Sequence, residues 1–281
     1  MGADIDSESA SRISLDPPFG TPYSRDAVLG LTAVAMKFVL HVLNRLEVKN
    51  EQRFLEVIHN RSPGQGLITI ANHRSTLDDP GILCGVLPLS FFYQEHEHKL
   101  NRWVLAAQDV CFSTWARSRF FQAGKAIPVD RGAGVLNQPG VELAIQKVRD
   151  GEWLHVFPEG KVCADRDPSV MLPFKWGVGR TVCEAAKGPE FPVVLPFFHR
   201  GMDEVKELKN PLIGVGKTVD VVFGEPIKME DLLLKCRKCI KDTEKEKLWS
   251  EITNRMRKAV LELQYEWEES RLVDTQQSSG P

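Results

Sequence analysis

The segment Leu67-Ile-Thr-Ile-Ala-Asn-His-Arg-Ser-Thr-Leu-Asp-Asp-Pro80 joins a short apolar run to a polar turn. Leu67 to Ala71 is apolar and rich in β-branched side chains, which predicts a buried strand. Asn72 ends this run, and Asp78-Asp79-Pro80 is typical of a helix start, where acidic side chains meet unpaired backbone N–H groups. The pattern therefore predicts a strand that delivers His73 to the edge of a sheet.

His73 and Asp78 are the chemically interesting pair in this segment. If Asp78 binds one imidazole nitrogen, the other nitrogen of His73 is free to take a proton. That is two-thirds of a catalytic triad, and a hydroxyl on the substrate could supply the missing nucleophile. With seven histidines and 38 acidic residues, roughly one such pair is expected by chance. A structural histidine is therefore the alternative, and the segments that follow must decide.

Three later segments repeat the same design of a strand followed by polar groups. They are Gly124-Lys-Ala-Ile-Pro-Val-Asp-Arg-Gly132, Trp153-Leu-His-Val-Phe-Pro-Glu-Gly-Lys161 and Phe191-Pro-Val-Val-Leu-Pro-Phe-Phe-His-Arg-Gly201. Open α/β sheets bind ligands at the carboxyl ends of their strands. The polar groups of all four segments are thus predicted to meet at one edge of a sheet.

In this order the four blocks resemble the glycerophospholipid acyltransferase superfamily, and within it the tafazzin family of phospholipid–lysophospholipid transacylases. The resemblance runs in consistent order from about residue 30 to residue 265. It is carried by Asn72-His73 with Asp78-Asp79-Pro80, Asp109-Val-Cys-Phe112, Phe157-Pro-Glu-Gly-Lys-Val162, Lys175-Trp-Gly-Val-Gly-Arg180 and His199-Arg-Gly-Met202.

Two details leave the branch of the family open. Ser75-Thr-Leu-Asp78 and His199-Arg200-Gly201 are more similar to plant-type relatives, which acylate lysophospholipids or the amine of phosphatidylethanolamine. The stretch from Arg131 to Val141 is also short and has no long insertion. The acyl acceptor therefore remains open between these alternatives.

Acyl transfer assigns roles to the residues of the first segment. His73 would remove the proton of the acceptor hydroxyl, and Asp78 would fix the imidazole tautomer and stabilise the imidazolium. Asp79 is an alternative partner for His73, although helix capping is the role we expect for it. The chain has no G-x-S-x-G elbow, and Ser75 is too close to His73 in sequence to be favoured as a nucleophile.

Phosphate recognition needs cations near the base. Arg131 is the best candidate clamp because a guanidinium binds phosphate oxygens at two points, and a surface salt bridge is its alternative. We expect Glu159 to bind acceptor hydroxyls or to orient Arg131, Gly160 to offer a backbone N–H, and Lys161 either to bind phosphate or to be solvated. Three further cations are weaker candidates: Lys125, Lys175 and Arg200.

No metal or cofactor site is predicted. His96 and His98 have a metal-like composition but lie in a charged stretch that favours a solvated loop. The six cysteines show no disulfide framework, and Cys236-x-x-Cys239 has no second pair, so chance placement is the favoured interpretation. A reducing or membrane-facing compartment therefore fits better than secretion.

Length and composition agree with one domain. With 281 residues and 42% hydrophobic content the chain supports a full core, and its net charge of −2 gives no reason to expect nucleic acid as a partner. We divide it into a disordered segment 1–23, a membrane-interface helix 24–47, an acyltransferase domain 48–272 and a disordered tail 273–281. Residues 1–23 lack signal-peptide features, and their acidic composition argues against a conventional transit peptide.

The expected order of elements is typical of a mostly parallel central sheet covered by helices. Strands are expected at 67–71, 103–107, 126–129, 153–157, 193–198 and 218–223. Helices are expected at 50–60, 79–87, 140–150, 173–187, 229–238 and 244–270.

The helical pattern from Ala27 to Leu46 is apolar at first and then interrupted by Lys37, His41 and Arg45. A spanning helix needs about 20 largely apolar residues. We therefore expect this helix to lie in the membrane interface with its basic groups toward the headgroups, and a helix packed on the domain is the alternative.

The sequence thus predicts an O-acyltransferase that remodels glycerophospholipids at a membrane surface, as a peripheral or monotopic protein. The resemblance implies phospholipid and lysophospholipid substrates, with cardiolipin the leading candidate, and mitochondrial membranes. An enzyme that uses acyl-CoA to acylate a lysophospholipid, or the amine of phosphatidylethanolamine, is the alternative. A non-catalytic lipid-binding scaffold is the alternative of another class, and it would have no need of the His73–Asp78 pair.

Overall fold

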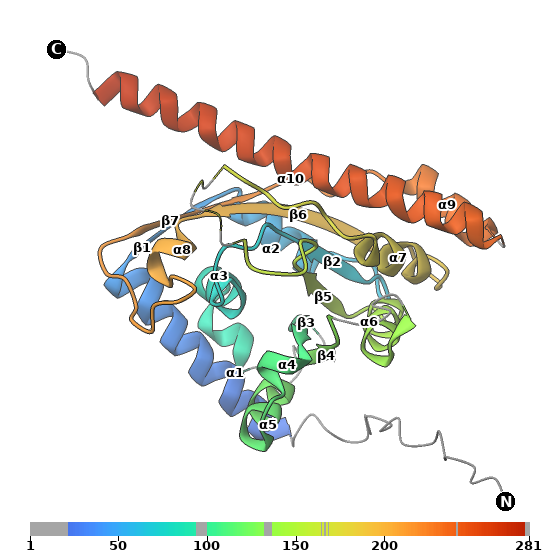
Figure 1. Cartoon of the computed structure of the whole chain (residues 1–281), viewed down its shortest axis with the longest axis horizontal. Helices are drawn as coiled ribbons and strands as arrows, with labels where there is room; N and C mark the ends of the chain where they lie inside the picture. Colours follow the sequence, from blue (N-terminus) through green and yellow to red (C-terminus); the bar gives the residue numbers. More distant parts are fainter. Residues whose placement is uncertain are drawn as a thin grey trace, which may run out of the picture.

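Seven strands form one sheet in the order β1-β7-β6-β2-β5-β3-β4 in a computed structural model of the chain (Figure 1). The structure describes residues 22–93, 100–131, 137–163, 165, 167, 169–239 and 241–278. The strands are β1 (Arg45–Lys49), β2 (Leu67–Ile70), β3 (Trp103–Ala107), β4 (Ala126–Val129), β5 (Trp153–Val156), β6 (Val193–Arg200) and β7 (Thr218–Phe223).

Helices connect and cover these strands. In the described ranges they are α1 (Pro22–Lys37), the π-helix η1 (Phe38–Leu43), α2 (Glu51–His59), α3 (Asp78–Val86), the 3₁₀ helix η2 (Leu89–Phe92), α4 (Gln108–Cys111), α5 (Trp115–Ala123), α6 (Pro139–Arg149), α7 (Trp176–Ala185), α8 (Met202–Val205), α9 (Glu230–Lys238) and α10 (Asp242–Ser278). The prediction of a mostly parallel α/β sheet covered by helices is confirmed.

Strand direction brings the predicted polar segments to one edge. Strand β2 pairs in parallel with both β5 and β6, and β3 pairs in parallel with both β5 and β4. Only the pair of β6 and β7 is antiparallel among the ladders of this sheet in the described chain. The carboxyl ends of β2, β3, β4, β5 and β6 therefore share one edge, which is where His73 follows β2.

Alternating side chains divide the core into two layers. On β6, Val194 and Phe198 pack in the layer formed with α6, α7, α9 and α10, whereas Leu195 and Phe197 pack in the layer formed with α1, α2 and α3. Figure 1 shows α10 lying across one face of the sheet and α1 on the opposite side. This alternation within one strand is what a sheet buried on both faces requires.

The N-terminal helix is docked on α3 over a close helix–helix contact. Leu29, Ala33 and Leu40 are buried on its inner side. At Gly85 of α3, a Cβ would come within 2.9 Å of the ends of the Leu40 and Leu46 side chains, which would have to shift to admit a larger residue. By length and composition the stretch Ser24–Leu43 is also apolar enough to cross a membrane, and 22% of its window is buried.

Residues 45–47 correct the predicted helix boundary. We expected helix as far as Leu46, but Arg45 begins strand β1, which pairs in parallel with β7. The alternating pattern from Arg45 to Lys49 is too short to be distinguished from a helix end without knowledge of its partner, which lies about 170 residues later.

Other differences lie on the periphery of the sheet. The short helices α4 and α5 were not expected from the sequence. At the C-terminus, α10 continues to Ser278, so residues 273–278 are helical where we expected an irregular tail, and residues 279–281 lie outside the described residues. Of the predicted disordered segment 1–23, residues 1–21 likewise lie outside the described part, and α1 begins at Pro22.

Cys183 and Cys236 form a disulfide between α7 and α9, which corrects the expectation that no disulfide is present. Their Cα atoms are 5.4 Å apart, and both residues are fully buried. The partner of Cys236 is therefore not Cys239, the other member of the C-x-x-C pair, which is a free cysteine. Cysteines separated by 53 residues give no local signal of pairing.

Candidate active site

His73 lies directly after β2 and is bonded to Asp78 at the start of α3. The distance from His73 Nδ1 to Asp78 Oδ2 is 2.9 Å. A carboxylate only accepts hydrogen bonds, so Nδ1 carries the hydrogen and Nε2 is the nitrogen with a free lone pair. The side chain of His73 is 18% exposed while that of Asp78 is fully buried. This is the pairing and the tautomer that a general base requires.

Asp78 is held by its own turn. Its Oδ2 also accepts hydrogen bonds from the backbone N–H groups of Arg74 (2.6 Å) and Ser75 (2.8 Å). Burial opposes the charged carboxylate, but the attraction of His199, the hydrogen bond from His73 and the Ser75 N–H outweigh it and lower the pKa of Asp78. Asp78 is therefore negatively charged, and its charge would stabilise an imidazolium formed at His73.

Phe157 and Glu159, which follow β5, support His73 from the other side. The rings of His73 and Phe157 are stacked with centroids 4.0 Å apart. The buried Glu159 carboxylate accepts hydrogen bonds from the backbone N–H groups of His73 (2.7 Å) and Leu172 (2.9 Å). Burial raises the pKa of the Glu159 carboxyl, while its two N–H partners oppose that rise. Glu159 thus holds the backbone of His73 in place.

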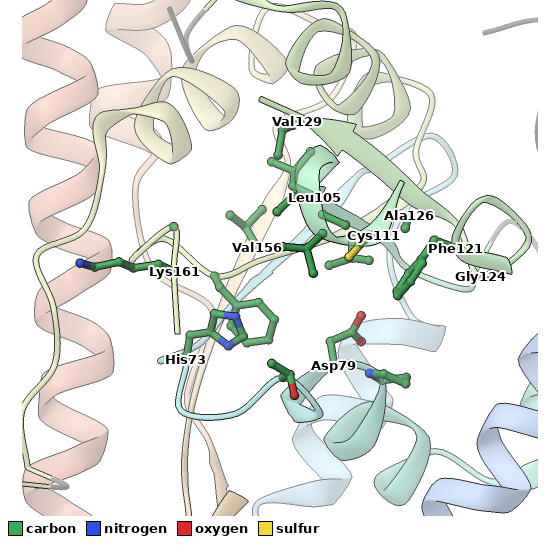
Figure 2. Close-up of a pocket in the computed structure, with 18 of the residues that line it drawn as sticks. His73, Asp79, Leu105, Cys111, Phe121, Gly124, Ala126, Val129, Val156 and Lys161 are labelled. Atoms are coloured by element: carbon green, nitrogen blue, oxygen red, sulfur yellow. The ribbon is translucent and has the colours of Figure 1, made fainter. Parts of the chain in front are cut away.

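A cavity of about 610 Å³ opens beside His73. Its walls are mainly apolar and come from α1, β3, α4, α5, β4, β5 and α7. Figure 2 shows the ring of His73 at the cavity together with Leu105, Val129, Val156 and Phe121. A volume in the range of small-molecule sites and an apolar lining suit the hydrocarbon chain of a lipid.

Asp79 lines the same cavity, but in neither of the roles expected from the sequence. Its carboxylate makes a two-point contact with the buried Arg102, with Oδ1–Nε at 2.6 Å and Oδ2–Nη2 at 2.7 Å. Burial would lower the pKa of Arg102, but the Asp79 carboxylate outweighs it and raises that pKa. Asp79 is thus the partner of Arg102 and does not serve as the cap of α3.

Arg131 lies at the cavity and is engaged by a carboxylate. Its guanidinium binds Asp109 Oδ2 at 2.5 Å, and both side chains are well exposed. The salt bridge that we considered as the alternative to a phosphate clamp is therefore present in the folded chain. The two roles are compatible, because an exposed ion pair is weak and a phosphate can compete with it.

The Pro-Glu-Gly-Lys turn differs in detail from expectation. Glu159 does not bind Arg131, and it is absent from the cavity wall in the described structure. The N–H of Gly160 is already bonded to the carbonyl of Phe157, and its φ of +72° explains why glycine occupies this position. Lys161 lines the cavity with its stem, and Figure 2 shows its amine pointing away from His73.

The weaker candidate cations separate into two groups. Lys175 lines the cavity, whereas Arg200 lies over the ring of Trp267 at 5.4 Å. Lys125 is 1% exposed and contacts Asn101 and Glu152 away from the cavity, so it is unsuited to bind phosphate. Burial lowers the pKa of Lys125 to about 7.

Two further expectations concern Ser75 and the histidine pair. The hydroxyl of Ser75 donates to the carbonyl of Lys206, in agreement with a structural role. His96 and His98 lie outside the described residues.

His199 is the site residue whose role sequence reasoning missed. It lies near the end of β6, fully buried, with Nε2 2.8 Å from the carbonyl oxygen of Asn72 and 3.5 Å from Asp78 Oδ2. The amide of Asn72 in turn bonds the backbone N–H and carbonyl of His199. A histidine after a strand was visible in the sequence, but its contact with Asp78 depends on the adjacency of β2 and β6.

The fold and this site define an α/β acyl-transfer protein, in which a carboxylate-held histidine lies beside an apolar cavity at the carboxyl edge of a sheet. Comparisons with known proteins agree. The acyltransferase family profile matches residues 45–197. Tafazzin of Drosophila melanogaster is 41% identical over 212 residues, which cover 75% of this chain and 53% of that protein.

Two other relatives lead to the same group. The N-acylphosphatidylethanolamine synthase of Arabidopsis thaliana is 39% identical over 73% of this chain and 71% of its own length. The Dictyostelium discoideum protein named taffazin is 39% identical over 60% of this chain and 57% of its own length. The chain therefore spans little more than half the length of the Drosophila melanogaster and Dictyostelium discoideum relatives. The chain belongs to the acyltransferase family, with tafazzins and an N-acylphosphatidylethanolamine synthase among its relatives.

Proposed function

We propose that this protein transfers a fatty acyl chain from a phospholipid to the free hydroxyl of a lysophospholipid. The observation that carries the proposal is the His73–Asp78 pair, whose free Nε2 lies at an apolar cavity of about 610 Å³. A base beside an apolar cavity suits a reaction between a hydroxyl and a long-chain ester. The resemblance to the tafazzin family makes cardiolipin the leading substrate to test.

In the proposed reaction, Nε2 of His73 takes the proton as the acceptor oxygen attacks the ester carbonyl carbon of the donor. The resulting imidazolium is stabilised by Asp78, which keeps its negative charge. Collapse of the tetrahedral intermediate breaks the bond between the carbonyl carbon and the donor's glycerol oxygen, and His73 returns the proton to that oxygen. The products are a new phospholipid and a new lysophospholipid, and no acyl-enzyme is formed.

We also propose that α1, η1 and α5 present the protein to a membrane. The apolar face consists of exposed side chains on these helices: Leu31, Val34, Phe38, Val42, Trp115 and Phe120. Those of α1 and η1 recur every three or four residues, and their helices contact α3 on the other side, which suits a helix lying in the plane of the interface. Mitochondrial membranes are the first location to test, by the resemblance to the tafazzin family.

The contacts of Lys37 and His41 differ from those expected from the sequence. We expected Lys37 and His41 to point toward lipid headgroups, but both contact the carbonyl oxygen of Gly85 near the end of α3. They therefore help to hold α1 on the domain, where cations suit the negative end of a helix.

A second activity is supported by one of the relatives. The Arabidopsis thaliana protein is named for N-acylphosphatidylethanolamine synthesis, so the amine of phosphatidylethanolamine is an alternative acceptor. Acyl-CoA is the alternative donor expected from the sequence. A scaffold that binds lipid without chemistry is the alternative of another class. The pairing of a His73 that reaches the cavity with a fully buried Asp78 favours an enzyme over a scaffold.

The deciding experiment incubates purified protein with isotope-labelled lysolipids in vesicles that contain donor phospholipid, with and without acyl-CoA, and identifies the products by mass. Labelled phospholipid without acyl-CoA is the expected result. Formation only with acyl-CoA, or acylation of the amine, would select the alternative enzymes.

His73→Ala and Asp78→Asn test the base directly. We expect His73→Ala to lower turnover by about 10²–10⁴-fold with the melting temperature nearly unchanged. Asp78→Asn should also be severe, because an amide can impose the wrong tautomer. Near-normal turnover of folded His73→Ala protein would rule out the proposed base.

A further inference from the structure

Behind the catalytic pair lies a second imidazole that the reaction above does not use. His199 is fully buried, so it has no access to a substrate in the cavity. Its Nε2 lies 3.5 Å from the same carboxylate oxygen, Asp78 Oδ2, that binds His73 Nδ1 at 2.9 Å. The carboxylate therefore lies between one histidine at the cavity and one histidine in the core.

The hydrogen bonds around His199 define its tautomer. Nε2 is 2.8 Å from the carbonyl oxygen of Asn72, which can only accept, so Nε2 carries the hydrogen. Nδ1 has no hydrogen-bond partner in the described residues, as expected of the unprotonated nitrogen. Burial lowers the pKa of His199, against the opposing attraction of Asp78. His199 thus directs its Nε2–H toward the carbonyl oxygen of Asn72, with Asp78 Oδ2 beside it at 3.5 Å.

The ring is held rigidly between two strand ends. The side chain of Asn72 accepts a hydrogen bond from the backbone N–H of His199 at 3.0 Å and donates one to the backbone carbonyl of His199 at 2.9 Å. Together with the ring contact, these bonds tie the end of β6 to the residue immediately before His73. The other titratable groups near the ring are His73, from the turn after β2, and Asp203, from α8.

All the contacts of Asp78 converge on one oxygen. Oδ2 accepts hydrogen bonds from His73 and two backbone N–H groups and lies 3.5 Å from Nε2 of His199, whereas Oδ1 has no partner in the described residues. A change at His199 must therefore act on the oxygen that binds the base. No other side chain of the described site connects Asp78 to the core in this way.

We propose that His199 is a positioning residue for this site, which shares the Asp78 carboxylate with His73 and so sets both the orientation and the basicity of the base. The catalytic part of this inference rests on the proposed function. Without the N–H of His199, the carboxylate has more negative charge available to His73. The imidazolium of His73 should then be more stable, and the protonated, inactive form should persist to higher pH.

The test compares three substitutions of His199. His199→Phe keeps a ring of similar shape but removes the N–H, His199→Asn leaves a side chain too short to reach Asp78, and His199→Gln can restore an N–H near the position of Nε2. The matched control is His59→Gln. His59 lies at the end of α2, where its ring faces that of Phe91 with centroids 6.4 Å apart.

The first readout is the titration of His73 followed by NMR of the full-length protein labelled with [15N]histidine, which needs no catalysis. We expect the midpoint to rise by about half a pH unit or more in His199→Phe and His199→Asn, and to return toward the wild-type value in His199→Gln. The midpoint should be unchanged in His59→Gln. An unchanged midpoint in folded His199→Phe overturns the proposal. If that variant does not fold, equal midpoints for His199→Asn and His199→Gln overturn it.

The second readout is acyl transfer. We expect kcat to fall by about 10–100-fold in His199→Phe, as for a small misplacement of a catalytic group, with KM for the lysolipid unchanged because His199 does not reach the cavity. The acidic limb of the pH profile should move upward with the NMR midpoint. If the wild-type protein has no transfer activity, the proposed function fails, whereas the NMR result still decides whether His199 controls the Asp78–His73 pair.

Discussion

At the scale of single residues, the site depends on polar groups that are held before any substrate arrives. Glu159 illustrates the point, because a residue that we expected to meet the acceptor instead binds the backbone of His73 at 2.7 Å. Asp79 likewise is committed to Arg102. Such prior commitments fix the geometry of a base and remove the need to reorganise it during the reaction. The residues left to meet a substrate phosphate are those at the exposed rim of the cavity.

Arg131 and Asp109 give a residue-scale prediction about this rim. If Arg131 binds the substrate phosphate, Asp109→Asn should lower KM by up to about five-fold, because it removes an exposed competitor for the guanidinium. Arg131→Lys should raise KM, since an ammonium does not reproduce the planar two-point contact. Initial rates on a series of lysolipids measure both effects.

Asp231→Asn is the control for that experiment, because Asp231 forms an exposed ion pair with Arg255 on the α9–α10 side of the protein. The KM of the Asp231→Asn variant should equal that of the wild type. If Arg131→Lys and Asp109→Asn both leave KM unchanged, the Arg131–Asp109 pair is only a surface salt bridge.

At the scale of elements, α1 connects the site to the surface. Leu29 of this helix is buried and lines the cavity, while Leu31, two residues later, is 69% exposed. The same helix therefore helps to form the apolar cavity and the proposed membrane surface. On the opposite side of the sheet, α7 lines the cavity and is linked to α9 by the disulfide between Cys183 and Cys236.

The apolar face predicts membrane binding. Replacing Leu31, Val34 and Phe38 together by Asp should move the protein from liposomes to the supernatant, because burial of each side chain contributes about 1.5–3 kcal/mol. Cosedimentation with phospholipid vesicles is the measurement, with circular dichroism to verify the fold.

The matched control is a triple Asp variant of exposed apolar residues on α9 and α10, namely Leu234, Tyr265 and Leu272. Figure 1 shows these helices on the side away from α1. This variant should sediment as the wild type does. Equal sedimentation of the α1 variant would show that the membrane contact lies elsewhere.

The disulfide predicts a stability difference between oxidised and reduced protein. The bond closes a loop with a sequence separation of 53 residues, which corresponds to roughly 4 kcal/mol of loop entropy in the unfolded chain. Cys236→Ala should therefore lower the denaturant midpoint under oxidising conditions, while Cys239→Ala should not. Mass spectrometry after alkylation counts the thiols, and two additional alkylated cysteines in unreduced wild-type protein would contradict the bond.

At the scale of the whole molecule, we expect the stability of the fold to depend on a buried amine that lies outside the cavity lining. Lys125 is packed between the Trp103 ring, at 4.7 Å, and the Glu152 carboxylate. Burial lowers its pKa to about 7 from the ordinary 10.5, despite the opposing Glu152. Below pH 7 the folded chain therefore bears the cost of a buried ammonium. As pH rises from 7 to 10.5 the folded form loses the proton first, and the cost disappears.

The sign of this effect can be measured. Lys125→Met should be more stabilising, relative to the wild type, at pH 6 than at pH 9, with a difference on the order of 1–3 kcal/mol in the free energy of unfolding. Urea denaturation at both pH values gives the comparison. Lys258→Met, at an exposed position on α10, should show no such pH dependence. An effect of Lys125→Met that is equal at both pH values would contradict the lowered pKa.

The linear order of residues was sufficient to predict the class of fold and the contact between His73 and Asp78. Apolar runs bounded by turns locate β2, β3, β4, β5, β6 and β7, because side-chain periodicity is a local property of the chain. His73 and Asp78 belong to one turn, so their contact is also local. The alternation of strands and helices along the chain then predicts a parallel sheet, in which the polar ends of the strands share one edge.

Folding decided the contacts between distant segments. Strand β1 becomes recognisable only beside β7, and Cys183 is bonded to Cys236 only because α7 and α9 are neighbours. His199 reaches Asp78 because β6 lies next to β2 in the sheet. The physical reason is that local propensity specifies which elements form, whereas the pairing of elements depends on how the whole chain buries its apolar faces. Side chains that meet across 50 to 170 residues leave no periodic signal in the sequence.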